Sequence, residues 1–245
     1  HLPEAAVLAV RRVLAGEMLV AAEDRFQVER SLPHGAVAAI LGVLRALDLE
    51  RLLSRERSRE RDLVTALICQ RLLAPGSKLS ASRRFGKTTL SEELELGEVS
   101  EAELMQALDW LVARQGRVER ALARRYLVPG GFVLYDLSSS YLEGRCCPLA
   151  ALGYSRDGRK GQLQITYGLI CSPEGRPVAV EVFPGNTPDQ ETLPQALSAV
   201  TERFGVKEAV IVGDRGMLTQ AHVDTLKANG MGFISALRAP QVKAL

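Results

Sequence analysis

The stretch GGFVLYDLSSSYLEG, residues 130–144, decides the fold, because the sequence changes there from a helical to a strand-like pattern. Pro129 and two glycines precede an apolar segment, Phe132 to Leu137, that has the pattern of a buried strand. Asp136 interrupts the apolar segment, and three serines follow shortly after it. Two interpretations are open for Asp136: a residue that ends a strand, or a carboxylate held at a sheet for chemistry.

The composition is that of an ordinary globular protein. The chain has 245 residues, of which 47% are hydrophobic and 24% charged, and its net charge is only +2. This length allows one large domain or two smaller ones, and no global field points to a polyanionic partner. The four cysteines form no C-x-x-C pair, and no apolar run is long enough to span a bilayer. We therefore predict a cytoplasmic protein with no membrane partner.

The part before residue 129 is predicted to be all helical. Ser100 and Glu103 form a capping box that opens a helix running through Trp110 towards Tyr126, with a break at Gly116 as the alternative. Apolar residues at helical spacing predict three earlier helices, over Glu4–Phe26, Ala36–Leu47 and Asp62–Leu73. We predict that residues 1–128 are a helical region for DNA contact, subunit pairing or both.

The part after residue 128 alternates strands with helices. Apolar runs predict strands over residues 132–137, 163–171, 177–183, 209–212 and 232–237. Helices are predicted from Thr187 to Phe204 and from Thr219 to Ala228. The order β-β-β-α-β-α-β predicts an α/β domain with a mixed sheet over residues 129–245.

Two acidic residues, Asp136 and Asp214, each come at the carboxyl end of a short apolar strand. Ligands of α/β sheets bind beyond such strand ends, and two close carboxylates favour a bound Mg²⁺. For a single aspartate at such a position, capping a strand or a turn is the commoner role. A haloacid-dehalogenase-like phosphohydrolase is a weaker alternative, since that class needs a second Asp where this chain has Ser138.

Basic residues gather near these acids. In GYSRDGRKGQLQ, residues 153–164, Arg156, Arg159 and Lys160 flank an Asp-Gly turn, and Arg215 directly follows Asp214. A basic hairpin tip is expected where a nucleic-acid backbone passes, although a solvated loop has the same composition.

A second basic region lies in the helical part. Residues 51–87 hold ten Lys or Arg and three acids, a local charge of +7, whereas residues 91–103 hold six acids and no base. This separation favours phosphate contact by the basic part, and a solvated helix surface is the alternative. The candidates for DNA contact are Lys78, Arg83, Arg84 and Lys87.

Several segments in series resemble the DDE transposases of bacterial insertion sequences. They are LYDLSSSYLEG, LGYSRDGRKGQLQITYGLICSPEGRPVAVEVFPGNTPDQETL, VIVGDRGM and FISALR, preceded by RLLAPGSKLSASRRF and ALDWLVARQGRVERAL. The resemblance extends from about residue 35 onward, and the segments stand in the order expected of that family.

The resemblance implies a ribonuclease-H-like core that cleaves and joins DNA. Asp136 and Asp214 would be the first two metal-binding acids, on the first and fourth strands, holding Mg²⁺ or alternatively Mn²⁺. The implied partners are double-stranded DNA, as element ends and as target, and a second copy of the chain when assembled on DNA. The implied location is the bacterial cytoplasm, in association with the nucleoid.

The chain departs from the family pattern in one respect. The family's third acid is a Glu on a later helix, whereas no Glu follows Glu208 and the only acid after Asp214 is Asp224, which comes too soon. We therefore expect a core that is incomplete at its C-terminus and a polypeptide that by itself does not cut DNA. The alternative function is that of a non-catalytic, DNA-binding transposase remnant.

Overall fold

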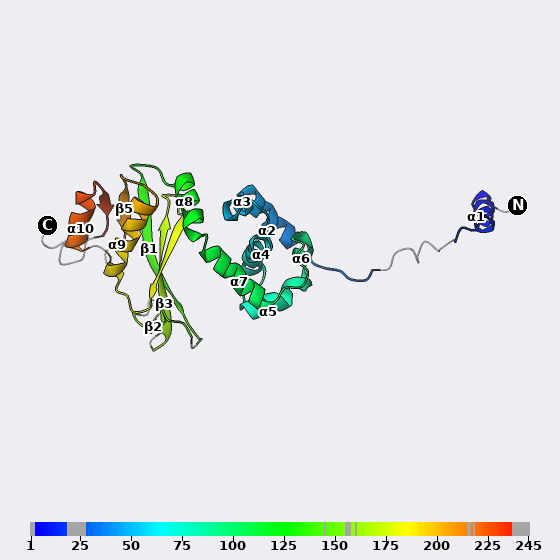
Figure 1. Cartoon of the computed structure of the whole chain (residues 1–245), viewed down its shortest axis with the longest axis horizontal. Helices are drawn as coiled ribbons and strands as arrows, with labels where there is room; N and C mark the ends of the chain where they lie inside the picture. Colours follow the sequence, from blue (N-terminus) through cyan, green and yellow to red (C-terminus); the bar gives the residue numbers. More distant parts are fainter. Residues whose placement is uncertain are drawn as a thin grey trace. The chain divides into compact units, whose positions relative to one another are not determined.

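The computed structural model describes residues 3–18, 28–144, 146–154, 158–159, 161–214, 217 and 219–236. The chain forms two compact units (Figure 1): unit 1 comprises residues 1–47 and 58–105, and unit 2 comprises residues 48–57 and 106–245. Within the described residues, no helix is long and apolar enough to cross a membrane. The functional division at residues 128 and 129 stays a prediction.

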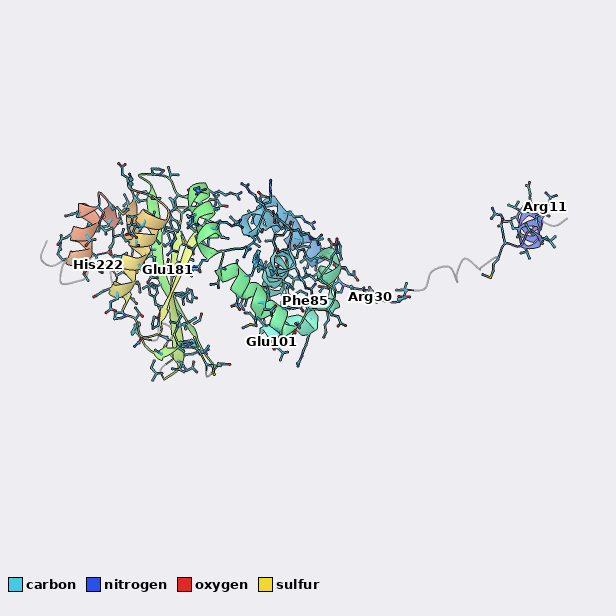
Figure 2. The ribbon with its side chains drawn as sticks, in the orientation of Figure 1. Arg11, Arg30, Phe85, Glu101, Glu181 and His222 are labelled. Atoms are coloured by element: carbon cyan, nitrogen blue, oxygen red, sulfur yellow. The ribbon has the colours of Figure 1, made fainter. Side chains whose placement is uncertain are left out.

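Unit 1 is built from helices, as predicted. The central helix, α4 (Arg59–Leu73), carries eight buried residues (Figure 1). Phe85 packs among the helices with only 2% of its surface exposed (Figure 2). The elements of unit 1 are α1 (Glu4–Leu14), α2 (Gly35–Ala46), the central α4, α5 (Lys78–Arg84), the 3-10 turn η2 (Phe85–Lys87), α6 (Leu90–Glu93) and the start of α7 (Glu101–Val112).

Two helices are shorter than predicted. The first ends at Leu14 rather than Phe26, because the chain turns at Gly16 with a left-handed φ of 86°. Residues 19–27 of that prediction lie outside the described residues. The helix after Ser100 ends at Val112, and a new helix, α8 (Gln115–Tyr126), follows. At this break the amide of Arg114 bonds to the carbonyl of Leu111, three residues back, which tightens the last turn.

The capping box of α7 is confirmed. The amide of Glu103 donates to the Ser100 hydroxyl at 3.2 Å, and the amide of Ser100 donates to the Glu103 carboxylate at 2.9 Å. These bonds satisfy amides at the helix start that have no partner within the helix.

Unit 2 contains a mixed sheet. Strand β1 pairs antiparallel with β3 and parallel with β5, β3 also pairs antiparallel with β4, and β5 pairs parallel with β6. The main order is therefore β4-β3-β1-β5-β6, and the short β2 also pairs with β3. The predicted mixed sheet after an all-α region is confirmed. The strands are β1 (Phe132–Tyr141), β2 (Ala151–Leu152), β3 (Leu163–Cys171), β4 (Pro177–Pro184), β5 (Val210–Gly213) and β6 (Gly232–Ile234).

Helices bury one face of this sheet. Helix α9 (Asp189–Ser198) continues as a π-helical turn, η3 (Ala199–Arg203), and Leu193, Ala196 and Val200 enter the core with Tyr135 and Ile170 of the sheet. The helix predicted from Thr187 begins at Asp189, and Pro188 precedes this first helical residue without making a side-chain cap. Helix α10 (Gln220–Ala228) begins with a capping box of Thr219 and His222 (Figure 2). The short helix α3 (Leu49–Leu53) contacts α8.

Candidate active site

Two acidic residues occupy adjacent positions in the sheet of unit 2. Tyr135 of β1 and Gly213 of β5 are partners in the parallel register. Asp136 and Asp214 directly follow these partners, and both are exposed. Because neighbouring strands lie about 4.8 Å apart, the register brings the two carboxylate-bearing residues together from distant parts of the chain.

The position of Asp136 differs from the prediction. It lies in the middle of a ten-residue strand, not at its end, whereas Asp214 does follow the last residue of β5. The reason is the long antiparallel ladder with β3, in which Asp136 pairs with Leu169 and the serines pair with later residues as far as Tyr141 opposite Gln164. A role in ending the strand is therefore excluded for Asp136.

The face of the sheet that carries Asp136 is open. Tyr135 and Leu137 are buried in the core, so by the alternation of a strand Asp136 and Ser138 point to the opposite face, where both are exposed. A cavity of about 270 Å³ lies on this face, lined by Leu134, Asp136, Leu137, Ser138, Tyr167, Leu169, Cys171 and Gly175. A ligand from solvent can therefore reach the Asp136 carboxylate.

The thiol of Cys171 shares this cavity with Asp136. Burial raises the pKa of Cys171, and the negative charge of Asp136 raises it further. The side chain is therefore a neutral thiol at neutral pH. The carboxylate of Asp136 is the hard oxygen donor in this cavity.

The donor set suits a hard divalent cation. Mg²⁺ is commonly held by one or two carboxylates while substrate phosphates and water fill its other positions. Asp136 and Asp214 supply two carboxylates, and within the described ranges no group of three Asp, Glu, His or Cys side chains could hold a metal. Asp224, the later acid, accepts a hydrogen bond from Gln220 Nε2 at 3.0 Å on α10. The carboxylates of Asp136 and Asp214 thus suit Mg²⁺ or Mn²⁺ with an incomplete protein shell.

Of the predicted basic residues near the core, the structure places Arg159. Its side chain is exposed, and its guanidinium carbon lies 5.3 Å from the ring centroid of Tyr141, at the far end of β1. Arg156, Lys160 and Arg215 lie outside the described residues. Arg159 is therefore near the end of the same strand that carries Asp136.

The base of this basic segment is held by two backbones in close contact. A Cβ atom on Gly153 would overlap the carbonyl oxygen of Gly185, and one on Gly185 would overlap the carbonyl oxygen of Gln164. The buried Gln164 side chain donates from Nε2 to the carbonyl of Tyr154 at 3.0 Å and to that of Gly185 at 2.9 Å. The sequence contains one signal for this contact, a polar Gln at a position where the alternation of β3 demands burial.

A buried ionic network at β4 was not predicted. Arg203 contacts Glu119 of α8 at 2.7 Å and Glu181 of β4 at 2.8 Å. Figure 2 labels Glu181 on the sheet of unit 2. Glu119 also accepts from Gln115 Nε2 at 2.9 Å and from the Val180 amide at 3.2 Å. Arg203 and Glu119 are 84 residues apart, so no local pattern announces their pairing. The network joins two helices to the sheet that carries Asp136.

The predicted basic residues of unit 1 lie together on short consecutive elements. Lys78, Arg83 and Arg84 belong to α5, and Lys87 ends the 3-10 turn η2. Arg83, Arg84 and Lys87 are exposed, and Lys78 is half-buried. Their role in DNA contact stays a prediction.

The comparisons with solved structures show only a weak overall likeness. The Mos1 transposase paired-end complex with left transposon end is 12% identical with a TM-score of 0.31, over 99% of this chain and 70% of that chain. The Mos1 Strand Transfer Complex is 14% identical with a TM-score of 0.32, over the same shares of the two chains. TM-scores of this size support no argument about this chain. No curated protein matches it in sequence.

One family comparison is informative. Residues 147–244 match the family model described as Transposase DDE domain. The matched range includes Asp214 and the basic segment around Arg159, while Asp136 lies upstream of it. Within this range the chain is therefore similar in sequence to a DDE transposase domain.

Proposed function

We propose that this chain works in DNA transposition, cleaving and joining DNA at insertion-sequence ends by metal-assisted phosphoryl transfer. The observation that carries the proposal is the parallel register of Tyr135 and Gly213, which sets Asp136 and Asp214 side by side. The match of residues 147–244 to the Transposase DDE domain supports the choice of reaction.

The roles of the residues follow from their chemistry. Asp136 and Asp214 hold a divalent cation, Mg²⁺ or in its place Mn²⁺. When bound, the ion supplies Lewis-acid stabilisation for transfer at the phosphodiester. Arg159, with Arg156, Lys160 and Arg215, neutralises and positions DNA phosphates. This division of labour suits phosphoryl transfer, in which positioning and charge stabilisation contribute most of the catalysis.

The proposed partner is double-stranded DNA, both as element end and as target. Lys78, Arg83, Arg84 and Lys87 of unit 1 contact its phosphates. Two element ends must be brought together for joining, so we propose a homodimer assembled on DNA, within the bacterial cytoplasm and nucleoid. Sedimentation of the chain with and without duplex DNA tests this assembly.

A non-catalytic, DNA-binding role of this polypeptide is the second candidate. It is favoured by one feature of the sequence: no Glu follows Glu208, and Asp224 is bonded to Gln220 on α10. If this second candidate holds, the 245-residue polypeptide binds metal and DNA without strand transfer. Metal-dependent plasmid cleavage that is lost in Asp136→Asn would contradict this expectation.

Iron-mediated cleavage of the protein tests the metal site directly. Fe²⁺ with ascorbate and peroxide, taking the place of Mg²⁺, generates radicals that cut the backbone near the bound ion. We expect cuts near residues 136 and 214 that excess Mg²⁺ suppresses. Asp136→Asn and Asp214→Asn should abolish both cuts, whereas the control Asp224→Asn should keep them. Unchanged cuts in Asp136→Asn would refute the assignment.

A further inference from the structure

Two groups of basic residues in unit 1 differ in their ion pairing, and the first group is paired. Three of the six acids in segment 91–103 form ion pairs with arginines from elsewhere in unit 1. Arg30 pairs with Glu92, Arg45 with Glu93 at 3.9 Å and Arg59 with Glu103 at 2.8 Å. These contacts connect elements within unit 1, so this group of arginines has a structural role.

The second group of basic residues forms no ion pair with any residue that the structure describes. It follows the chain from the end of α4 through α5 to η2, and four of its five members are exposed. Like charges gathered without counter-charges repel one another, and a polyanion relieves this repulsion while releasing its own counterions. The group consists of Arg71, Lys78, Arg83, Arg84 and Lys87.

Helix α5 is held at its start and along its inner side. Four residues, 74–77, join α4 to α5, and Ser77 caps α5 by accepting from the Ser80 amide at 3.1 Å. Ala81 and Phe85 are four residues apart and are 8% and 2% exposed, so they anchor one side of α5 in unit 1. Two helices joined by so short a turn form the arrangement in which the second helix commonly enters a DNA groove.

The outer side of α5 combines apolar and basic chemistry. Leu79, 40% exposed, and the exposed Arg83 are four residues apart on the side opposite Ala81 and Phe85. Arg84 and the half-buried Lys78 each lie about 120° from the centre of this stripe, on opposite sides, because each residue advances about 100° around a helix. An Arg can contact guanine bidentately, and an apolar side chain can contact the thymine methyl group.

We propose that α5 enters the major groove of duplex DNA, with Arg83 and Leu79 on base edges. Lys78 and Arg84 contact phosphates of the two strands that border the groove, and Arg71 and Lys87 extend the phosphate contact. This inference rests on the proposed function for its ligand, duplex DNA, and adds sequence reading to it. Unit 1 then determines which DNA sequence the chain binds.

Binding to selected and unselected DNA tests the assignment. The chain first selects its preferred duplexes from a random library, and affinity is then measured for a selected and an unrelated duplex over a series of salt concentrations. Arg83→Ala should lose about 5- to 100-fold on the selected duplex and much less on the unrelated one. Arg84→Ala should weaken both equally and reduce the salt slope by about 0.9. Arg45→Gln, an exposed but ion-paired arginine, is the matched control and should change neither.

The outcomes separate this inference from the proposed function. If Arg83→Ala weakens the affinity for both duplexes equally, base reading by Arg83 is overturned, while the proposal that the chain binds DNA still stands. Failure of the library to yield a preferred sequence also overturns it, while the iron-cleavage experiment reports on Asp136 and Asp214 independently. Thermal melting checks the fold of each variant, and Arg83→Gln is the second variant if Arg83→Ala melts early.

Discussion

Tyr135 and Gly213, 78 positions apart in the chain, are register partners on the adjacent parallel strands β1 and β5. This single pairing brings Asp136 and Asp214 to neighbouring positions on one sheet. Two carboxylates this close repel each other unless a cation lies between them. The repulsion is a property of the folded protein, and it can be measured without DNA.

Neutralising one acid should stabilise the metal-free protein. Asp136→Asn removes a like charge beside Asp214, so we expect a gain of about 1 kcal/mol, or roughly 2–4 °C in melting temperature, with EDTA present. Added Mg²⁺ should raise the melting temperature of the wild type and not that of the variant. Calorimetry with EDTA and with Mg²⁺ makes the measurement, and Asp224→Asn is the control. An equal Mg²⁺ response in Asp136→Asn would show that the cation binds elsewhere.

A side chain at Gly153 should disrupt the base of the basic hairpin. In Gly153→Ala the new Cβ would overlap the Gly185 carbonyl and lie 2.8 Å from Gln164 Nε2. We expect the free energy of unfolding to fall by about 1–3 kcal/mol, measured by urea denaturation. In the control Gly144→Ala, the Cβ would meet only the Leu142 side chain at 3.8 Å, an ordinary contact. Equal stabilities of the two variants would contradict the close approach.

Removal of Arg203 should leave two buried carboxylates without their cation. Glu119 is 4% and Glu181 6% exposed, and both contact Arg203. We expect Arg203→Met to cost about 2–3 kcal/mol, less than a fully buried pair, because the Arg203 side chain is itself 31% exposed.

A double-mutant cycle with Glu119→Gln measures the coupling in this network. The exposed pair Arg12–Glu17, with side chains 57% and 60% exposed, is the control, and Arg12→Met should cost less than about 1 kcal/mol. A coupling near zero between Arg203 and Glu119 would count against a structural role for the network.

Alkaline pH should unfold the wild type more readily than Tyr135→Phe. Burial raises the pKa of Tyr135 from 10 to about 12, and Tyr135 is only 3% exposed. Because the folded state binds this proton more tightly, the stabilisation is complete below pH 10 and is lost as the pH rises to about 12.

For a pKa shift of this size, the wild type should lose about 2–3 kcal/mol of its free energy of unfolding as the pH rises, and Tyr135→Phe should not show this loss. Urea unfolding of both proteins between pH 9 and pH 12 gives the comparison. Since lysines titrate in the same range in both proteins, the difference between the two curves isolates Tyr135. If the unfolding free energies of the two proteins fell in parallel with pH, ionisation of the Tyr135 hydroxyl would not destabilise the folded state.

The sequence alone determined the main helices and strands and their order. Apolar periodicity, the Pro129 break and the capping box at Ser100 are local signals, and they sufficed for the helical first part, the core strands and the two acids of interest. Local signals also set the limits of that prediction. The second half of β1 is polar, so its serines lack the apolar pattern of a strand although the ladder with β3 extends through them.

Only the tertiary structure decided which residues meet. The adjacency of Asp136 and Asp214, the contact of Gly153 with Gly185, and the sharing of Arg203 by Glu119 and Glu181 all join residues far apart in the chain. The same holds for which arginines of unit 1 are ion-paired. The local sequence does not distinguish an arginine that pairs with a distant Glu from one that faces solvent. The physical reason is common to all four: register, close packing and ion pairing depend on distances in space, which a short stretch of sequence does not contain.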